Sequence, residues 1–185
     1  MTKLVIVLTE GFADWETAHL AATARGWYGV DVVQVTPDGA PVTSAGGLRV
    51  HPALALIDAL ADADGLVLCG GTAWRTDPPD ISAVLQAFKG PIGAICDATR
   101  ALAGAGLLDD LRHTSNDAAT LADVLGYAGA EHFAASPVAI RDGRIITAPG
   151  TAPVSFMSEI LAVLGLADDN LRFYQGLLAA EHRMV

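Results

Sequence analysis

Apolar runs that do not alternate with polar residues constrain the fold of this chain more than any other feature. The strand-like segments are KLVIVLT at 3–9, VDVVQVT at 30–36, GLVLCGG at 65–71 and PIGAIC at 91–96. Runs of this kind are typical of strands buried on both faces of a parallel sheet. Segments with helical spacing lie between them, at 14–27, at 80–90 and directly after Cys96. The alternation predicts an α/β fold with a doubly wound, mostly parallel sheet sandwiched by helices.

The rest of the chain continues this fold without a linker, a repeat or a low-complexity tract. We expect a short hairpin around Gly46-Gly47, a helical piece at 58–64, a helix at 117–125, a hairpin at 137–148 turned by Asp-Gly, and helices at 153–165 and 169–183. One domain therefore accounts for residues 1–185.

Composition narrows the class of protein. The chain is 52% hydrophobic and 17% charged, which is far from a disordered profile. Its net charge of −10 and its lack of a basic stripe predict no nucleic-acid partner. It has neither a spanning segment nor a signal-peptide pattern, so we expect a cytoplasmic protein with no membrane contact. Two lone cysteines suggest neither a disulfide framework nor a metal site, and no cofactor motif is present.

Three short stretches follow buried strands and carry the residues with chemistry. They are TEGFADWE, CGGTAW and CDAT. In open α/β sheets, ligands bind outside the carboxyl ends of the strands. We therefore expect these three stretches to converge on one site that takes a small molecule.

Cys96 stands at the corner between the strand at 91–96 and the helix that follows. A residue on a sharp strand-to-helix turn exposes its side chain above the sheet, and small residues two positions away avoid clashes. Ala94 and Ala98 satisfy that demand, and a helix N-terminus favours a thiolate. The pattern predicts a nucleophile elbow at Cys96, with a buried core thiol as the alternative. Cys69, at the end of a strand, is interpreted as a core residue.

The neighbouring stretches offer supporting groups. Gly70 and Gly71, with the N–H of Asp97, can form an oxyanion hole, although a plain tight turn explains a glycine pair equally well. Glu16 is either an ordinary first-turn glutamate or a carboxyl that faces the sulfur. In the second case its pKa is raised, and it acts as a proton donor or as a general acid/base.

Three further side chains have both a functional and a structural interpretation. His113 can activate the thiol, or it can be a capping or structural histidine. Trp15 and Trp74 can form the wall of a pocket, or they can serve packing or a dimer interface.

Taken together, the motifs LTEGFADWETA, LCGGTAW, GAICDATRALAGAGLLDD, RHTSN and IITAPGTAPVSFMSEIL resemble the ThiJ/PfpI family, within the class I glutamine amidotransferase-like superfamily. The resemblance spans nearly the whole chain. It implies a flavodoxin-like α/β sandwich, a reactive cysteine at Cys96, a glutamate facing it at Glu16, an oxyanion-type pocket at Gly70 and Gly71, and a homodimer. Family activities include peptidase or amidase action, glyoxalase or deglycase action, isocyanide hydration, redox sensing and chaperone action.

The departures from the family pattern narrow the function. Protease-like members carry a histidine directly after the nucleophile, whereas this chain has Asp97, which adds negative charge beside the sulfur. The late segment APGTAPVSF has no histidine, so a triad-type glutaminase is not expected. Asn116 stands where redox-active members often have a histidine. The leading hypothesis is a cysteine-dependent hydrolase, hydratase or lyase acting on a small carbonyl- or amide-like molecule. One alternative is a non-catalytic redox sensor or stress-response protein in which an oxidant converts Cys96 to a sulfinate that Glu16 stabilises. Another is a binding module with a vestigial site.

Overall fold

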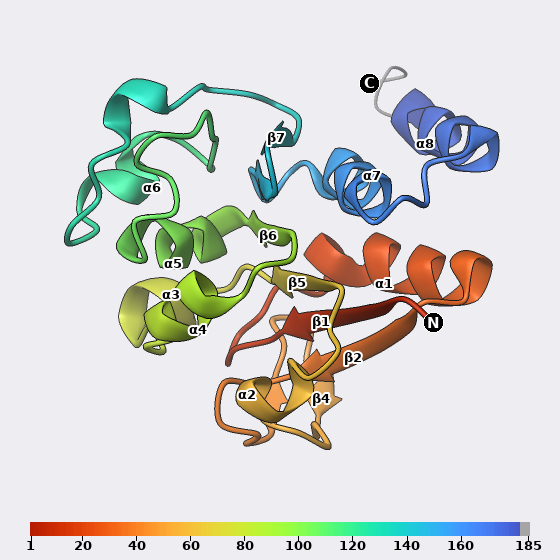
Figure 1. The fold of residues 1–185 in the computed structure, drawn as a ribbon, viewed down its shortest axis with the longest axis horizontal. Helices are drawn as coiled ribbons and strands as arrows, with labels where there is room; N and C mark the ends of the chain where they lie inside the picture. Colours follow the sequence, from red (N-terminus) through yellow and green to blue (C-terminus); the bar gives the residue numbers. More distant parts are fainter. Residues whose placement is uncertain (182–185) are drawn as a thin grey trace.

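The computed structural model describes residues 1–181 and is built around one six-stranded sheet (Figure 1). The strands are β1 (Lys3–Val7), β2 (Asp31–Val35), β5 (Gly65–Leu68), β6 (Ile92–Ile95), β7 (Ile140–Asp142) and β8 (Ile145–Ala148). Their spatial order is β2-β1-β5-β6-β8-β7, and all neighbours are parallel except β7 and β8. The five parallel strands thus follow the order 2-1-3-4-5 of flavodoxin-like sheets, which confirms the predicted fold class.

Helices cover both faces of the sheet because β1 and its neighbours are apolar on both sides. Leu4 and Ile6 pack in one core cluster, whereas Val5 and Val7 pack in the other. The first cluster contains residues of α1 (Asp14–Tyr28), α7 (Pro153–Val163) and α8 (Asp169–Glu181). The second contains residues of the short helices α2 (Leu56–Ala59), α4 (Ser82–Ala87), α5 (Thr99–Gly104) and α6 (Ala119–Ala122). The sheet is therefore the middle layer of a three-layer sandwich.

The predicted elements are present, most of them shorter than the sequence pattern suggests. The hairpin around Gly46-Gly47 forms from β3 (Val42–Thr43) and β4 (Arg49–Val50), and Gly47 has a φ of +88°. The helix expected at 117–125 is reduced to α6. Of the last predicted helix, residues 182 and 183 lie outside the described residues. The short helix α3 (Ala73–Thr76) and the 3₁₀ turns η1 (Cys96–Ala98) and η2 (Ala130–His132) were not predicted. Over residues 1–181, no helix is long and apolar enough to cross a bilayer.

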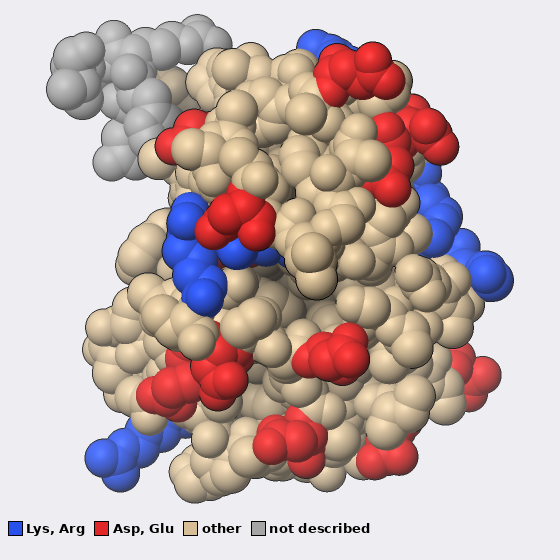
Figure 2. Space-filling view, turned by 90° about the vertical axis from the view of Figure 1, so that its left-hand side faces the viewer, with Lys and Arg blue, Asp and Glu red and all other residues tan. Residues whose placement is uncertain are grey.

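Two surface features complete the description. Figure 2 shows Asp and Glu side chains spread over the face it presents, with Lys and Arg in smaller groups beside them.

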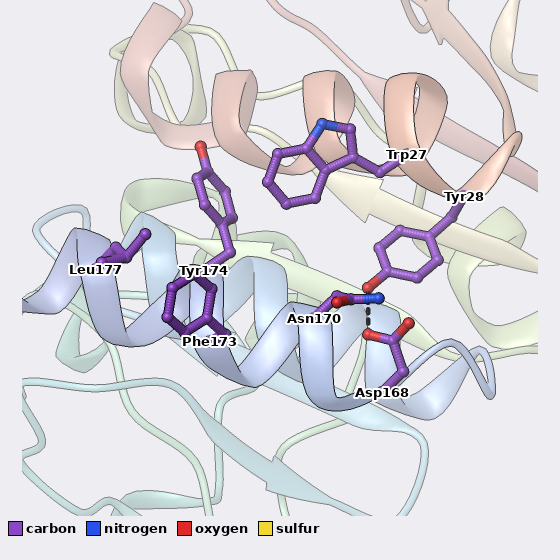
Figure 3. Close-up of a pocket in the computed structure, with 7 residues that line it drawn as sticks. All are labelled: Trp27, Tyr28, Asp168, Asn170, Phe173, Tyr174 and Leu177. Carbon is purple, nitrogen blue, oxygen red and sulfur yellow. Dashed lines mark hydrogen bonds between the residues drawn. The ribbon is translucent and has the colours of Figure 1, made fainter.

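A cavity of about 470 Å³ lies between the end of α1 and α8 (Figure 3) and is lined by Trp27, Tyr28, Asp168, Asn170, Phe173, Tyr174 and Leu177. The Tyr28 hydroxyl donates to Asp168 Oδ1 over 2.7 Å. None of the predicted site residues lines this cavity.

Candidate active site

The carboxyl ends of three adjacent strands bring the candidate site together. β1, β5 and β6 are neighbours in the sheet, and the chain leaves them toward Glu16, Gly70 and Cys96 respectively. The order of strands reverses between β1 and β5, which makes this edge the topological switch point where flavodoxin-like folds bind ligands.

The backbone turns sharply at Cys96. Ile95 is still extended, with φ −121° and ψ 144°, whereas Cys96 has a φ of +60° and begins the 3₁₀ turn that leads into α5. Within residues 1–181, Asp62 is the other non-glycine residue with positive φ. A left-handed conformation is strained for a side chain with a Cβ, and such residues concentrate at functional sites. Cys96 is half-buried, and the flanking Ala94 and Ala98 are fully buried. The local geometry is the predicted strand–turn–helix corner.

Glu16 lies buried in the first turn of α1, with 1% of its surface exposed. Its Oε2 accepts a hydrogen bond from the Gly70 N–H over 2.8 Å, and its carboxyl is hydrogen-bonded to the Cys96 thiol. Gly150 packs over the pair: a Cβ at that position would lie 2.8 Å from Glu16 Oε1 and 3.0 Å from Cys96 Sγ. Burial raises the pKa of Glu16 to about 7, and its hydrogen bonds to Cys96 and Gly70 oppose part of that rise.

Glu16 and Cys96 titrate as a pair. Burial and the negative charge of Glu16 raise the pKa of the Cys96 thiol to about 12. The expectation of a lowered thiol pKa is therefore wrong in direction, because burial beside a carboxylate outweighs the turn that follows. Two groups this close share their protons, so the values of about 7 and about 12 belong to the pair. Between these two pH values the pair holds one proton and one negative charge.

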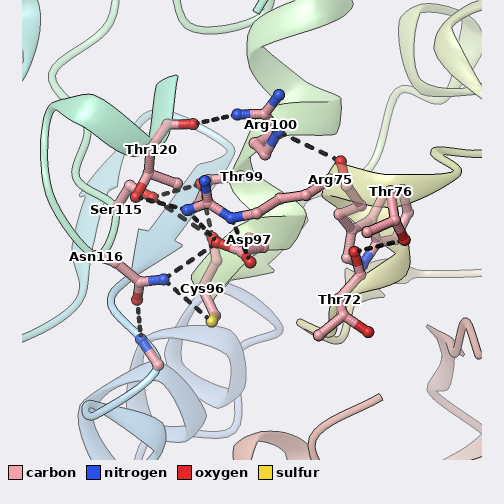
Figure 4. Close-up of polar contacts among 12 residues, drawn as sticks. Thr72, Arg75, Thr76, Cys96, Asp97, Thr99, Arg100, Ser115, Asn116 and Thr120 are labelled. Carbon is pink, nitrogen blue, oxygen red and sulfur yellow. Dashed lines mark hydrogen bonds and ion pairs between the residues drawn. The ribbon is translucent and has the colours of Figure 1, made fainter. Parts of the chain in front are cut away.

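Two N–H donors point at the sulfur and stabilise the charge there. Asn116 Nδ2 donates to Cys96 Sγ over 3.2 Å (Figure 4), and the Asp97 backbone N–H donates to the same sulfur. Both hydrogen bonds lower the pKa of Cys96. The Asn116 Oδ1 in turn accepts the Gly150 N–H over 2.9 Å.

The side chain of Asp97 is paired with a cation that the sequence analysis missed. Arg75 Nε donates to Asp97 Oδ2 over 2.8 Å, and Arg75 Nη2 donates to Asp97 Oδ1 over 2.9 Å (Figure 4). The negative charge that was expected beside the sulfur is therefore neutralised. Arg75 lies on α3, the unpredicted helix, so no spacing signal connected it with Asp97.

Comparison with known proteins identifies the family. The model of the DJ-1/PfpI family matches residues 2–163. This chain belongs to the DJ-1/PfpI family. The match confirms the resemblance to the ThiJ/PfpI family that the sequence motifs indicated.

Related DJ-1/PfpI proteins match the chain over most of its length. The solved DJ-1 superfamily protein Atu0886 from Agrobacterium tumefaciens is 42% identical, with a TM-score of 0.94, and the match covers 98% of this chain and all (100%) of that one. A thiJ/pfpI family protein from Bacillus anthracis is 32% identical, with a TM-score of 0.85, and the match covers 95% and 89% of the two chains. The Bacillus subtilis protein named "Uncharacterized protease YoaZ" is 33% identical over 188 positions, covering 95% of this chain and 90% of its own length.

In this DJ-1/PfpI chain, Gly70 and Gly71 allow close packing between loops, and this role is better supported than a role in an oxyanion hole. The Gly70 N–H is engaged by Glu16, so its prediction as an oxyanion donor is wrong. A Cβ at Gly70 would also meet Glu16 Oε2. Gly71 bridges to Phe12, and a Cβ there would lie 2.9 Å from Phe12 Cα. Both positions require the absence of a side chain because the loop after β1 lies directly against them.

Two predicted pocket residues have structural roles instead. Trp74 is 1% exposed, packs in the core and donates its indole N–H to the Cys69 carbonyl over 2.8 Å. His113 is fully buried, and its ring nitrogens lie 2.7 Å from the Leu111 carbonyl and 2.7 Å from the Tyr127 hydroxyl. Burial lowers the pKa of His113, which favours a neutral ring with both nitrogens occupied. The structural interpretation of both residues therefore fits. Trp74 lines a separate cavity of about 300 Å³ with Pro79 and Arg100, away from Cys96, and His113 is not a base at Cys96.

A cavity adjoins the Cys96–Glu16 pair at Gly150. It measures about 400 Å³ and is lined by Trp15, His19, Gly150, Thr151, Pro153, Val154 and Leu178. Trp15 is 57% exposed and forms part of the wall, as the sequence predicts for a pocket residue. His19 and Gly150 were missed, because their neighbourhood depends on α1 packing beside α7.

Proposed function

We propose that this DJ-1/PfpI protein is a cysteine-dependent enzyme that hydrolyses or hydrates a small carbonyl- or amide-like molecule. The observation that carries the proposal is the pair formed by Cys96, on a strained turn, and buried Glu16, whose carboxyl lies beside the sulfur. The donors from Asn116 and Asp97 favour the charge on sulfur. In the reactive form that we propose, the proton has moved from the Cys96 thiol to Glu16, where it is available to a leaving group.

The chemistry of amide hydrolysis follows from that arrangement. The thiolate of Cys96 bonds to the carbonyl carbon, and the displaced π pair becomes an oxyanion, for which we propose the Gly71 and Asp97 N–H groups as donors. The carbonyl reforms, the C–N bond breaks, and the nitrogen takes the proton of Glu16, which leaves a thioester. Glu16 then accepts a proton from the water that attacks the thioester, and the C–S bond breaks to return the thiolate.

The site favours small substrates. The cavity at Gly150 holds about 400 Å³ and combines the Trp15 indole with Pro153, Val154 and Leu178. Small molecules fit this space, whereas a folded protein does not. The name of YoaZ suggests a protease, but both ring nitrogens of His113 are occupied, so this histidine does not deprotonate the thiol. We expect no cleavage of casein by the purified protein, and casein cleavage that is lost in Cys96→Ala would overturn this expectation.

Redox sensing is the second candidate function, and the same donors favour it. Peroxide would convert the Cys96 thiolate first to a sulfenate and then to a sulfinate, with one water released at each step. A protonated Glu16 and the Asn116 amide are the donors that would stabilise the sulfinate oxygens.

The test compares turnover with oxidation. Wild type, Cys96→Ala and the control Cys69→Ala are assayed with amino-acid p-nitroanilides and with a 2-oxoaldehyde, methylglyoxal. We expect turnover in wild type and Cys69→Ala and its loss in Cys96→Ala. Turnover that survives in Cys96→Ala contradicts the enzyme proposal. An absence of turnover, together with a gain of two oxygen atoms on Cys96 after mild peroxide treatment, supports the sensor instead.

We also propose that the protein is a homodimer. Family membership supports this, and so do the exposed apolar side chains around the cavity between α1 and α8. Trp27, Phe173 and Leu177 are 55%, 70% and 56% exposed there. Light scattering coupled to gel filtration measures the mass in solution, and a mass of one 19.1 kDa chain would contradict a dimer.

A further inference from the structure

The amide of Asn116 has its orientation fixed on both sides. Its Oδ1 accepts the Gly150 N–H over 2.9 Å, so the oxygen must face Gly150. Its Nδ2 lies 3.2 Å from Cys96 Sγ and 3.3 Å from Asp97 Oδ1. Since an amide nitrogen carries two N–H groups, one can point at the sulfur while the other points at the carboxylate. Asp97 therefore supplies the acceptor that completes the orientation of the amide.

The carboxylate of Asp97 is itself held by Arg75 (Figure 4). The two hydrogen bonds, of 2.8 Å and 2.9 Å, form a bidentate pair from the guanidinium to the two carboxylate oxygens. Arg75 Nη2 also donates to Thr120 Oγ1 over 3.3 Å. The Asp97 side chain is 14% exposed, whereas Arg75 is 44% exposed. The cation thus lies at the surface and connects α3 with the residue next to the cysteine.

We propose that Arg75 is a positioning residue for Cys96. By holding Asp97 in a bidentate pair, Arg75 fixes the acceptor that orients the Asn116 amide toward the sulfur. The inference rests on the proposed role of Cys96 and extends it to a residue that does not touch the sulfur. It also accounts for Asp97 in the position directly after the cysteine, because the Arg75–Asp97 pair orients a donor there without a histidine.

Lysine would not reproduce this geometry. Its ammonium is a point charge on a flexible stem, whereas guanidinium holds both carboxylate oxygens at once. Charge alone is the competing explanation, because Asp97 without Arg75 would repel an anionic sulfur through space. The two explanations differ in whether the effect of Arg75 depends on Asn116.

The experiment measures alkylation of Cys96 by iodoacetamide as a function of pH, in a Cys69→Ala background that leaves one thiol. The charged and titratable groups near Cys96 are Glu16 and Asp97, with Arg75 bound to Asp97, His19 in the adjoining cavity and Cys69 removed. We expect Arg75→Met to slow alkylation at neutral pH by roughly two- to tenfold, the effect of one lost hydrogen bond, and to move the midpoint of the pH profile upward. We expect Arg75→Lys to recover part of the rate.

A double-mutant cycle decides the mechanism. Asn116→Ala should slow alkylation by itself, and adding Arg75→Met to Asn116→Ala should change the rate no further. The matched control is Arg141→Met, since Arg141 is 41% exposed and pairs with Glu159 away from the site; its pH profile should equal that of wild type. The proposal is overturned if Arg75→Met leaves the profile unchanged, or if it slows alkylation equally with and without Asn116. Because alkylation requires no substrate, this outcome is independent of whether turnover is found.

Discussion

The carboxyl ends of β5 and β6 each carry a cysteine one residue past the strand, and the two thiols have opposite surroundings. Cys69 is fully buried, continues the ladder through its N–H to the Val7 carbonyl over 3.0 Å, and donates its thiol to the Ala13 carbonyl. Cys96 leaves the ladder with a φ of +60°, is half-buried and receives N–H donors from Asn116 and Asp97.

The difference shows that the pKa alone does not identify a reactive thiol. The pKa of both cysteines is raised to about 12. For Cys69 the first cause is burial, in a site with a weak hydroxyl contact from Thr17 over 3.5 Å. The charge of Glu16 adds to the rise at both thiols, but at Cys96 it is the second cause after burial, and it disappears when Glu16 holds the proton. Access, backbone strain and a proton-holding partner distinguish the two positions.

The largest expected effect is on alkylation of the two thiols. Native protein treated with iodoacetamide should carry the label on Cys96, at a rate about 100-fold or more above that of Cys69, because a buried thiol reacts only when the structure opens. Peptide mass spectrometry of wild type, Cys96→Ala and Cys69→Ala measures both rates. Labelling mainly at Cys69 would reverse the comparison and remove Cys96 from the proposed mechanism.

The second effect is on stability and belongs to Glu16. Folding raises the pKa of this carboxyl from 4.5 to about 7, so the folded protein binds its proton more tightly than the unfolded chain does. The contribution of this group to stability is fully present below about pH 4.5 and is lost as the pH rises through about 7, a change of about 3 kcal/mol. Urea unfolding of wild type and Glu16→Gln between pH 5 and 8 should show this decline in wild type and its loss in the variant. Parallel pH dependences in the two proteins would contradict a shifted Glu16.

The third effect is the change in the pKa of the Cys96 thiol when Glu16 is replaced. Glu16→Gln keeps a donor to Cys96 but removes the carboxylate charge that raises the thiol pKa, whereas Glu16→Leu removes both the charge and the hydrogen bond. We expect the leucine variant to raise the thiol pKa by about 1–2 units relative to the glutamine variant, the value of one charge-assisted bond. Absorbance of the thiolate near 240 nm follows the titration, with Cys69→Ala as the background. Identical curves would mean that Glu16 does not act on Cys96.

The last effect probes Gly70, which follows Cys69 and touches Cys96. In Gly70→Ala the new Cβ would meet Glu16 Oε2 and would lie 2.6 Å from Cys96 Cβ, so overpacking should cost about 1–3 kcal/mol. The matched control is Gly104→Ala in α5, where the Cβ would lie 3.6 Å from Val124 Cγ1 and should be neutral or slightly stabilising. Urea midpoints compare the two, and equal midpoints would contradict the tight contact.

Much of the fold could be predicted because the pattern of burial is local. The apolar runs of β1, β5 and β6 are buried at almost every position, as expected of strands covered on both faces. Helix α1 ends one residue beyond the prediction, with Gly29 in the left-handed conformation as its C-cap. The short helix α3 could not be predicted, since four residues carry no readable period.

The candidate site likewise contains residues that could be predicted from the sequence and residues that could not. Cys96 at a corner with small flanks, and Glu16 in a first helical turn, could be selected from residues near them in the chain. The roles of Trp74 and His113 could not, because an indole or an imidazole fits a pocket wall and a core equally well until its hydrogen-bond partners are known. Those partners are the Cys69 carbonyl for Trp74, and the Leu111 carbonyl with the Tyr127 hydroxyl for His113.

The sequence by itself therefore determined the α/β class, the edge of the sheet that carries the candidate site and the cysteine at its corner, since each depends on apolar periodicity and on turns between neighbouring residues. Tertiary structure alone decided which groups surround the sulfur. Arg75 meets Asp97 across 22 positions and Gly150 meets Asn116 across 34. Contacts of that range form only when separate strands and loops pack at one edge, and the same packing supplies the burial that raises the pKa of Glu16.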